Sequence, residues 1–573
     1  MNPSSQAPPS AYAPIPARPN ALIQAAGWLA VAVPVLVFAV VWLRYAINIP
    51  KWDDHALKTF LGNLQGETTL TGKMYQLFRQ HNEHRIVWDR LITWLDYRLF
   101  GKLSYVRLMA VGNLSLVGLL AVFGLVLRRA RRSIWFLVPV ACLLFNLAQW
   151  ENMFWGMAAL QNFSVLLWVA GSLYLLAYTQ HSVAAFGLAV LATLTSGNGL
   201  VIWPIALILI LHQSLTQPIR YRNWRLLLGW SVGAAVVIGL YFLGYEKPTV
   251  TPPPPPGVGQ ILLGGLAFNG AAAEALPLRS LFLTCELLGA VAIGVTLFFG
   301  AKLIRNNNLT RPLPPVDYFF VGMVGFLIGT GIIVTWSRVG FGFETLITSR
   351  YKIYSLTLLA LLFTYGAVTL TDRFRPLVLA VGLSFGGVLA WLSYPAYLDD
   401  TLRLRRWLQA SQFNWTYTQN RPVSAIDAQT AQLIDNAPAG YDRCLSRLFG
   451  PATGTIMALD TLYPTQTGYV LTVGSTPTIQ SDNAGTYLRL RSAQRTWLIA
   501  VEPTLNASRW ADLGLANRFT AGFTAGIAQT EPPKGTYDID VLTVTDHGTC
   551  QVHPTGQRVS VLGPPASTVQ TNW

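Results

Sequence analysis

The sequence predicts a polytopic α-helical membrane protein that carries a β-rich, water-exposed domain at its C-terminal end. Three observations lead to this fold class. Apolar residues make up 52% of the 573 residues and charged residues only 12%, about half the charged share of a soluble globular protein. Apolar windows of about twenty residues, the length that crosses a bilayer, recur up to about residue 394. After about residue 399 they give way to short segments rich in β-forming residues.

Eleven apolar windows meet or approach the length of a membrane span. They cover residues 22–47, 106–127, 133–149, 157–178, 182–196, 199–214, 226–244, 280–300, 316–336, 351–371 and 375–394. The shortest pair flanks the turn at Ser196–Gly199. Before the first window, residues 1–20 are rich in Pro, Ala and Ser, which predicts a disordered tail.

The positions of Lys and Arg predict which side of the membrane each connector faces, because basic connectors stay in the cytoplasm. The basic short connectors fall on one side: residues 128–132, 219–225, 302–311 and 371–375. The long first loop, residues 50–105, and the domain at 399–573 then face outward. The first loop nevertheless holds eight Lys and Arg, which calls for a functional explanation. The net charge of +15 follows from these topology signals, so no nucleic-acid partner is predicted.

Two amphipathic helices are predicted in the first outer loop. Apolar residues recur at helical spacing in residues 56–64 and again in residues 87–95, which gives each helix one apolar face. Such helices at a membrane exit lie in the interface plane with that face in the headgroups. They would form a rim around a site that opens toward lipid.

An acidic pair, Asp53 and Asp54, follows the first window. A carboxylate at this position could accept a proton from an attacking hydroxyl, or hold a divalent cation such as Mg²⁺ or Mn²⁺. Alternatively, one of the two caps the helix that follows. Adjacent residues point to different faces of a helix, so at most one of them is predicted to act as a base.

Five consecutive residues with hydrogen-bonding side chains lie further along the first loop. Among them, His81, His84 and Arg85 suit an anionic phosphate, with Glu83 orienting them. A solvated turn between two helices is the alternative interpretation. Neighbouring His and Glu lack the i, i+4 spacing of helical zinc ligands, so the cluster does not predict a zinc site.

Further outward-facing connectors add Glu151 and two arginines, Arg338 and Arg350, at the mouths of predicted spans. Charged side chains at such positions ordinarily snorkel to the interface. The alternative is that the arginines are directed at a lipid phosphate.

The C-terminal region, residues 399–573, is predicted to be a β-rich domain, because runs of β-formers alternate with Gly, Pro, Asn and Asp. It contains no nucleophile elbow, metal-ligand spacing or phosphate loop. A structural or acceptor-docking module is predicted, with a carbohydrate-binding sandwich as the alternative. Outside the cytoplasm, Cys444 and Cys550 are candidates for a disulfide; the alternative is two free buried thiols.

Several stretches carry a resemblance to a known family. They are WDD (52–54), QHNEHRI (80–86), WENMFWG (150–156), TSGNG (195–199) and TSRYKIY (348–354). With the acidic pair at the outer end of the first span, they resemble uncharacterised bacterial members of the GT-C superfamily, in which an HNEHR stretch follows the acidic pair. These are glycosyltransferases that use polyprenyl-phosphate sugars as donors. The resemblance covers roughly residues 22–393.

The resemblance implies a GT-C-like transmembrane domain over residues 21–398 and transfer of a sugar, with inversion, to an acceptor hydroxyl. It implies that Asp53 or Asp54 is the catalytic base. It also implies that Arg85, with His84 beside it, and more loosely Arg350, lie near the donor phosphate. Beyond WDD the sequence has no clear DxD-type metal pair.

The implied location is the cytoplasmic membrane of a bacterium, with the active face and the C-terminal domain outside the cytoplasm. The implied partners are a lipid-linked sugar donor, membrane lipids, and an acceptor that is a glycan, a lipid or a protein. The competing hypothesis is a transporter or flippase of a lipid-linked saccharide. A transporter predicts internal repeats and charges at mid-membrane depth. The sequence has no visible fixed-period repeat and few ionisable residues inside the windows, so a transferase is the prediction.

Overall fold

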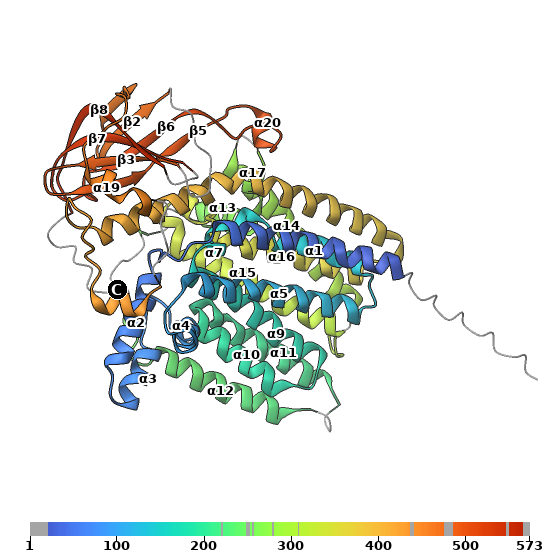
Figure 1. The fold of residues 1–573 in the computed structure, drawn as a ribbon. Helices are drawn as coiled ribbons and strands as arrows, with labels where there is room; N and C mark the ends of the chain where they lie inside the picture. The colour runs from blue at the N-terminus through green and yellow to red at the C-terminus, as the bar shows by residue number, and fades with distance from the viewer. Residues whose placement is uncertain are drawn as a thin grey trace, which may run out of the picture.

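The structure is a computed structural model that describes residues 21–564, apart from 219–221, 248–252, 255–256, 278–279, 308, 436–440, 475–484 and 546–548. The tail at 1–20, for which the sequence predicts disorder, lies outside the described residues. Long helices run alongside one another, and the short helices α2, α3 and α4 lie at one end of this bundle (Figure 1). The strands lie over the same end.

Ten helical segments of the described chain are long and apolar enough to cross a membrane, judged by length and composition. They coincide with ten of the eleven predicted windows. Their main helices are α1 (Ala21–Tyr45), α5 (Tyr105–Arg129), α6 (Leu137–Leu144), α9 (Ser164–Tyr178), α11 (Ile202–Thr216), α12 (Trp224–Phe242), α14 (Leu281–Asn306), α15 (Pro315–Arg338), α16 (Ser349–Thr369) and α17 (Arg375–Thr416). The protein is therefore mostly helical, with about ten helices that suit a membrane-embedded chain.

The remaining window forms a shorter helix, α10 (Ser182–Thr195), of 14 residues. It is about 21 Å long at 1.5 Å per residue. The hydroxyl of Ser172 in α9 donates to the carbonyl of Ala185 at 2.8 Å, so α10 packs along α9. A second short apolar helix, α13 (Val258–Asn269), packs against α14. None of the eleven predicted windows covers this helix, which lies in a segment that the sequence predicts to be a Pro-rich loop from about Tyr245 to Ser280.

Contacts between helix ends define two opposite faces of the bundle. The site face comprises residues 50–105, 150–158, 196–199, 241–245 and 338–350, which contact one another through ion pairs and hydrogen bonds. The basic face comprises residues 128–133, 174–181, 212–217, 302–307, 309–318 and 368–376. α10 begins at the basic face and ends at the site face, where Gly197 donates its N–H to His84. It therefore joins the same two faces as its longer neighbours.

The first loop folds into α2 (Asp54–Gly66), α3 (Leu70–Phe78) and α4 (Val87–Phe100). Two of these are the predicted amphipathic helices. The apolar face of α2 is not free to meet headgroups, because Leu57, Phe60 and Leu61 are at most 1% exposed. They pack with the start of α5, Trp155 and the C-terminal segment. The predicted interfacial orientation is therefore wrong for α2. α3 has the exposed apolar side chains instead, among them Leu70 and Tyr75.

The last long helix, α17, is continuous over 42 residues. The domain boundary expected at residues 398–399 lies inside it, so the basic segment that follows extends a span rather than starting a separate helix. Beyond Pro395, α17 packs against strand β4. The indole N–H of Trp391 donates to the carbonyl of Leu513 at 3.2 Å, which attaches a loop of the C-terminal domain to the helix.

In its described residues, the C-terminal domain has two four-stranded antiparallel sheets, with strand orders β1-β2-β6-β5 and β4-β3-β7-β8. The strands are β1 (Thr461–Pro464), β2 (Gly468–Val473), β3 (Gly485–Arg491), β4 (Thr496–Ala500), β5 (Glu502–Leu505), β6 (Phe519–Ala528), β7 (Gly535–Val544) and β8 (Cys550–Val561). Leucine, isoleucine and valine side chains of both sheets form one buried cluster. Alternate residues of the second sheet pack instead against Ala410 and Phe413 of α17. Three short helices, α18 (Ala428–Leu433), α19 (Leu445–Phe449) and α20 (Arg509–Asp512), complete the region.

Cys444 and Cys550 form a disulfide that connects the segment before α19 to the start of β8, with Cα atoms 5.9 Å apart. Both cysteines belong to the buried cluster between α17 and the second sheet. The bridge closes a loop over a sequence separation of 106 residues. Cys142 and Cys285 are free.

We predict that Cys444→Ala/Cys550→Ala destabilises the C-terminal domain by about 2–5 kcal/mol, because a long closed loop restricts the unfolded chain. Limited proteolysis at increasing urea concentrations measures this change. Cys142→Ala/Cys285→Ala is the matched control, and its midpoint should equal that of the wild type under oxidising conditions. Equal urea midpoints for the wild type and the 444/550 variant would contradict the prediction.

Candidate functional site

The turn between α1 and α2 has a strained backbone. Trp52 has φ +42°, the left-handed region that bulky side chains rarely adopt. Its ring packs edge-on against Trp155 at 5.3 Å and lies 6.3 Å from the ring of Trp407. Such strain persists only where the surrounding structure holds it, and it is found preferentially at functional sites. The next two residues along the chain are the acidic pair.

Asp54 is fully buried and bound to backbone N–H groups. It accepts hydrogen bonds from Lys51 at 3.1 Å and from Met157 at 2.8 Å. A Cβ at Gly156 would lie 3.1 Å from the carboxylate, so glycine allows this close approach. Burial raises the pKa of Asp54 to about 7. We therefore assign Asp54 to holding the first loop against residues 156–157, and not to the role of catalytic base.

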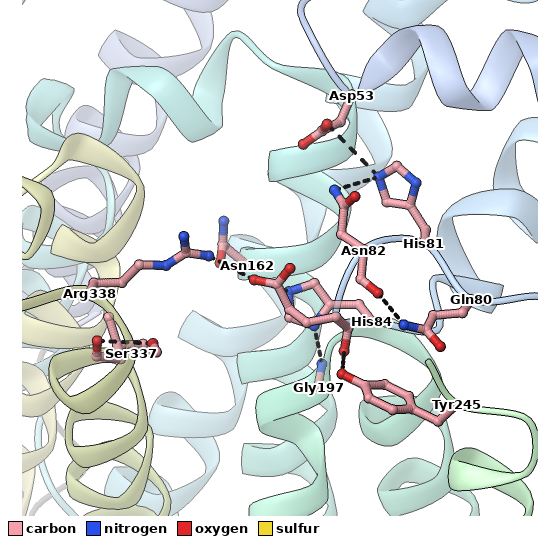
Figure 2. Close-up of polar contacts among 12 residues, drawn as sticks. Asp53, Gln80, His81, Asn82, His84, Asn162, Gly197, Tyr245, Ser337 and Arg338 are labelled. Carbon is pink, nitrogen blue, oxygen red and sulfur yellow. Dashed lines mark hydrogen bonds and ion pairs between the residues drawn. The ribbon is translucent and has the colours of Figure 1, made fainter. Parts of the chain in front are cut away.

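Asp53 is the accessible member of the pair, with 32% of its side chain exposed. It occupies the N-cap position of α2 but makes no capping hydrogen bond through its side chain, so the capping interpretation fails for Asp53. Its Oδ1 lies 3.9 Å from Nε2 of His81, as Figure 2 shows. Burial raises the pKa of Asp53; the Arg350 guanidinium opposes this increase, and the Glu83 carboxylate adds to it.

The residues 81–84 form a tight turn that directs polar side chains toward Asp53. The N–H of His81 and the N–H of His84 each donate to the other residue's carbonyl at 2.8 Å. Asn82 has φ +47°, a conformation that asparagine tolerates. Burial and the nearby Arg90 guanidinium lower the pKa of His81 to about 4. His81 is therefore neutral near pH 7 and could act on a phosphate only as a neutral hydrogen-bonding group.

Glu83 joins this turn to two other parts of the site face. Its Oε1 pairs with Nη2 of Arg338 at 2.7 Å and lies 3.9 Å from Nε2 of His84. The N–H of Gly197 donates to Nδ1 of His84 at 3.2 Å. Although burial opposes ionisation, His84 and Arg338 help to hold the pKa of Glu83 below its usual value. Side chains from the first loop and α15 thus point toward one another, as Figure 2 shows.

Arg85 connects the first loop to α12 through backbone carbonyls. Its guanidinium donates to the backbone carbonyls of Phe78, Tyr241 and Leu243, and the residue is only 8% exposed. Two of these carbonyls belong to the C-terminal end of α12, where a cation is stabilised. Arg85 therefore fixes the first loop to α12, while its place near a donor phosphate stays a prediction.

A second ion cluster lies beside the first. Glu151 pairs through Oε1 with Nζ of Lys51 at 2.8 Å and through Oε2 with Nε of Arg350 at 3.5 Å. The ammonium of Lys51 lies over the rings of Trp52 and Trp155, and its burial lowers its pKa. Arg350 keeps 34% of its side chain exposed. Lys51 was not predicted from the sequence, although its position directly before the WDD stretch was an available signal.

A chain of polar side chains extends from this cluster along the helices. Asn162 donates to Asn152 at 2.9 Å, Tyr354 donates to Asn162 at 3.3 Å, and Asn198 donates to Tyr354 at 2.9 Å. Asn162 lies in a π-helical turn at Ala159–Phe163, a distortion that occurs frequently at functional sites. No periodicity in the sequence identifies these contacts, because the four residues come from separate helical segments.

Aromatic side chains of the C-terminal segment cover the acidic turn. Trp407 lies 6.3 Å from Trp52 and Trp415 lies 5.2 Å from His55, measured between ring centroids. α18 packs against α2, and the N–H of Leu103 donates to the carbonyl of Leu433 at 2.8 Å. The linker to the C-terminal domain therefore forms part of the site's wall.

The donor set does not fit a dedicated metal site. Within the described residues, no group of three or more His, Cys, Asp and Glu side chains converges. Asp53 and Glu83 are instead associated with His81 and Arg338.

No protein family, no curated protein and no solved structure matches this chain. Of the predicted site residues, the structure brings Asp53, His81, Glu83, His84 and Arg338 into one cluster. Glu151 and Arg350 form the neighbouring cluster with Lys51, while Asp54 and Arg85 hold the first loop in position.

We predict that Asp54→Asn removes a pH dependence of stability. The folded-state pKa of about 7 lies above the ordinary value of a carboxyl group, so the folded protein binds the proton more tightly than the unfolded chain. Stability should fall by up to about 1.4 kcal/mol per pH unit as pH rises from about 4 to about 7. Thermal unfolding in detergent across this range measures the slope. Asp435→Asn is the control, because it changes the same group at an exposed position. A slope unchanged by Asp54→Asn would contradict the assignment.

Proposed function

We propose that this chain is an inverting GT-C-type glycosyltransferase that moves a sugar from a polyprenyl-phosphate donor to an acceptor hydroxyl. The observation that supports this proposal is the position of one accessible carboxylate, Asp53, in the same polar region as two partly exposed guanidiniums, Arg338 and Arg350. All three lie at the ends of apolar helices. A donor with a polyprenyl tail could keep that tail among the helices and present its phosphate at this face.

In the proposed reaction, Asp53 accepts the proton of the acceptor hydroxyl. The acceptor oxygen forms a bond to the anomeric carbon while the bond from that carbon to the phosphate oxygen breaks. The electron pair of that bond remains on the lipid phosphate, and attack from the opposite side inverts the configuration. A raised pKa suits this role, because a base is most effective when its pKa approaches the working pH. Protonated Asp53 then returns its proton to water.

The two arginines would stabilise the charge that develops on the leaving phosphate, because preformed cations need no reorganisation during the reaction. Glu151 and the Trp155 ring hold Arg350 from two sides. Glu83 holds Arg338. His81, which is neutral, would hold Asp53 in orientation. Lys51 would serve the same cluster indirectly, as the second partner of Glu151.

The C-terminal domain would contribute to acceptor handling. Its linker helix α17 brings Trp407 and Trp415 over the acidic turn. Trp52 and Trp407 remain partly exposed, at 47% and 36%, and could pack against the acceptor. We further propose that the protein resides in the cytoplasmic membrane of a bacterium with its site face and its C-terminal domain outside the cytoplasm.

The transporter hypothesis draws on a different observation, a buried ion pair between Lys352 and Glu274 with Tyr397 beside it. Ionisable groups buried among spans ordinarily mark a transport path. Lys352, however, is only three residues from the first residue of α16, at the site face rather than at the middle of a span. This position favours support of the site, so the transferase remains our conclusion.

We predict that Asp53→Asn lowers kcat for sugar transfer by about 10²–10⁴-fold, the contribution expected of a general base. The variant should insert and unfold like the wild type, because Asp53 makes no capping hydrogen bond. Transfer from radiolabelled polyprenyl-phosphate sugars to membrane acceptors measures the rate. Asp54→Asn, by contrast, should act through stability. Full activity of Asp53→Asn would refute the catalytic assignment.

We predict that Arg350→Gln and Arg338→Gln each lower kcat/KM for the donor by about 10–100-fold, since each removes a charge-assisted hydrogen bond to phosphate. Arg98→Gln is the matched control, because it removes the same charge from a position on the first loop outside both ion clusters. Initial rates at varied donor concentration measure the effect. Equal losses in all three variants would indicate general surface charge rather than a phosphate site.

A further inference from the structure

A pocket of about 460 Å³ lies on the basic face, at the opposite end of the bundle from the candidate site. It forms where the C-terminal end of α5 meets the start of the next span and the N-terminal end of α17. Its lining includes Arg131, Arg132, Ser133 and Arg375, together with Phe136 and Leu379. One carboxylate, Asp372, also lines it and pairs with Arg375. Three guanidiniums against one carboxylate leave the pocket with an excess of positive charge.

The backbone at Arg131 is strained in a way that a glycine would relieve. The N–H of Arg132 donates to the carbonyl of Leu127, and the N–H of Arg131 donates to that of Arg128, both at 2.9 Å. This pattern is a Schellman motif, whose left-handed position is usually glycine. Arg131 occupies that position with φ +54°. An arginine in this conformation costs about 1 kcal/mol relative to glycine, which makes its guanidinium a candidate for binding a ligand.

The guanidiniums in the pocket are only partly satisfied by the protein. Arg132 donates through Nη2 to the carbonyl of Val368 at 3.0 Å. The Nε atoms of Arg132 and Arg375 are buried and have no hydrogen-bond partner in the part of the chain that the structure describes. Burial and the neighbouring Arg375 charge lower the pKa of Arg132. An anion between the two guanidiniums would offset their repulsion.

The surroundings of the pocket are apolar on the side that leads along α17. Phe136 and Leu379 line it, and Leu377 and Val381 are exposed on the same helix, at 60% and 58%. Both belong to a segment that is long and apolar enough to span a membrane. A ligand that combines a phosphate with acyl chains would fit both parts of this surface. Basic pockets between span ends bind anionic headgroups in this way.

We infer that this pocket binds the phosphate of an anionic membrane phospholipid, with its acyl chains lying along α17. The site is separate from the proposed transfer reaction, and its role is to fix the connector between α5 and α6 against the start of α17. Inorganic phosphate offers the same headgroup chemistry without the acyl chains.

The test measures the thermal unfolding midpoint of the full chain in phosphatidylcholine vesicles, with and without phosphatidylglycerol. Phosphatidylglycerol should raise the midpoint of the wild type. Arg131→Gly should raise the midpoint in phosphatidylcholine alone, because glycine relieves the left-handed strain, yet reduce the increment that phosphatidylglycerol gives. Arg131→Gly/Arg132→Gln should abolish that increment, since each guanidinium lost weakens phosphate binding about tenfold.

Arg373→Gln is the matched control, because it removes a cation from the same face outside the residues that line the pocket. It should keep the full increment. If Arg373→Gln loses as much of the phosphatidylglycerol increment as the pocket variants do, the proposal is overturned, because any cation of this face would then attract the anionic lipid. An equal rise with inorganic phosphate in phosphatidylcholine vesicles would overturn it in favour of a free-phosphate site. No rise with phosphatidylglycerol in the wild type would overturn it outright.

Discussion

The carboxylate of Asp54 accepts backbone hydrogen bonds from Lys51, three residues before it, and from Met157, 103 residues after it. A carboxylate buried this completely persists only where N–H groups satisfy it. Its two bonds attach the exit of the first span to the start of the segment that carries Asn162. The strained turn at Trp52 and the accessible position of Asp53 both depend on this attachment. The rest of the site is assembled around a fixed acidic turn.

The two faces of the bundle differ in how their arginines are paired with carboxylates, and this difference indicates different roles. On the site face, Arg338 and Arg350 each face a carboxylate that orients the guanidinium while leaving it partly exposed. A cation held in this way is preorganised, so it can stabilise charge in a reaction without reorienting. In the pocket of the basic face, three arginines and one carboxylate line the surface, and the carboxylate pairs with Arg375. The pocket therefore has an excess of positive charge that a bound anion would neutralise. An anion that stays bound suits this excess better than a substrate that binds and leaves.

Ten of the predicted windows form long apolar helices, because twenty consecutive apolar residues have few alternatives to such a helix. No predicted window covered α13, since the prolines before residue 257 suggested a loop. It also misled about α2: an amphipathic pattern predicts an apolar face, but whether lipid or protein covers that face depends on tertiary contacts. The same limit explains Arg85, whose place in the HNEHR stretch suggested a phosphate ligand. Its partners include carbonyls at the end of α12, more than 150 residues away along the chain. The residues around Arg85 in the sequence do not predict such distant partners.

The continuity of α17 has a mechanical consequence for the site. A composition change near residue 399 predicted a domain boundary there, yet the helix runs unbroken from the basic face to the second sheet. Within it, Arg405 donates to the carbonyls of Tyr45 and Ala46 at the end of α1, both at 3.0 Å. Two residues later, Trp407 contacts Trp52 in the acidic turn. One stretch of helix therefore binds both the exit of the first span and the strained turn that follows it.

The next turns of the same helix bind the sheet. Asn414 exchanges two hydrogen bonds with the backbone of Leu498 in β4, both at 2.8 Å, and Gln409 accepts one from the hydroxyl of Tyr487 in β3. Because residues 405–414 lie in one uninterrupted helix, the sheet and the acidic turn are fixed to the same rigid element. A displacement of the C-terminal domain would have to move Trp407 or break these contacts. The domain thus holds a fixed position relative to Asp53. A fixed position suits the proposed role in presenting an acceptor better than a flexible attachment would.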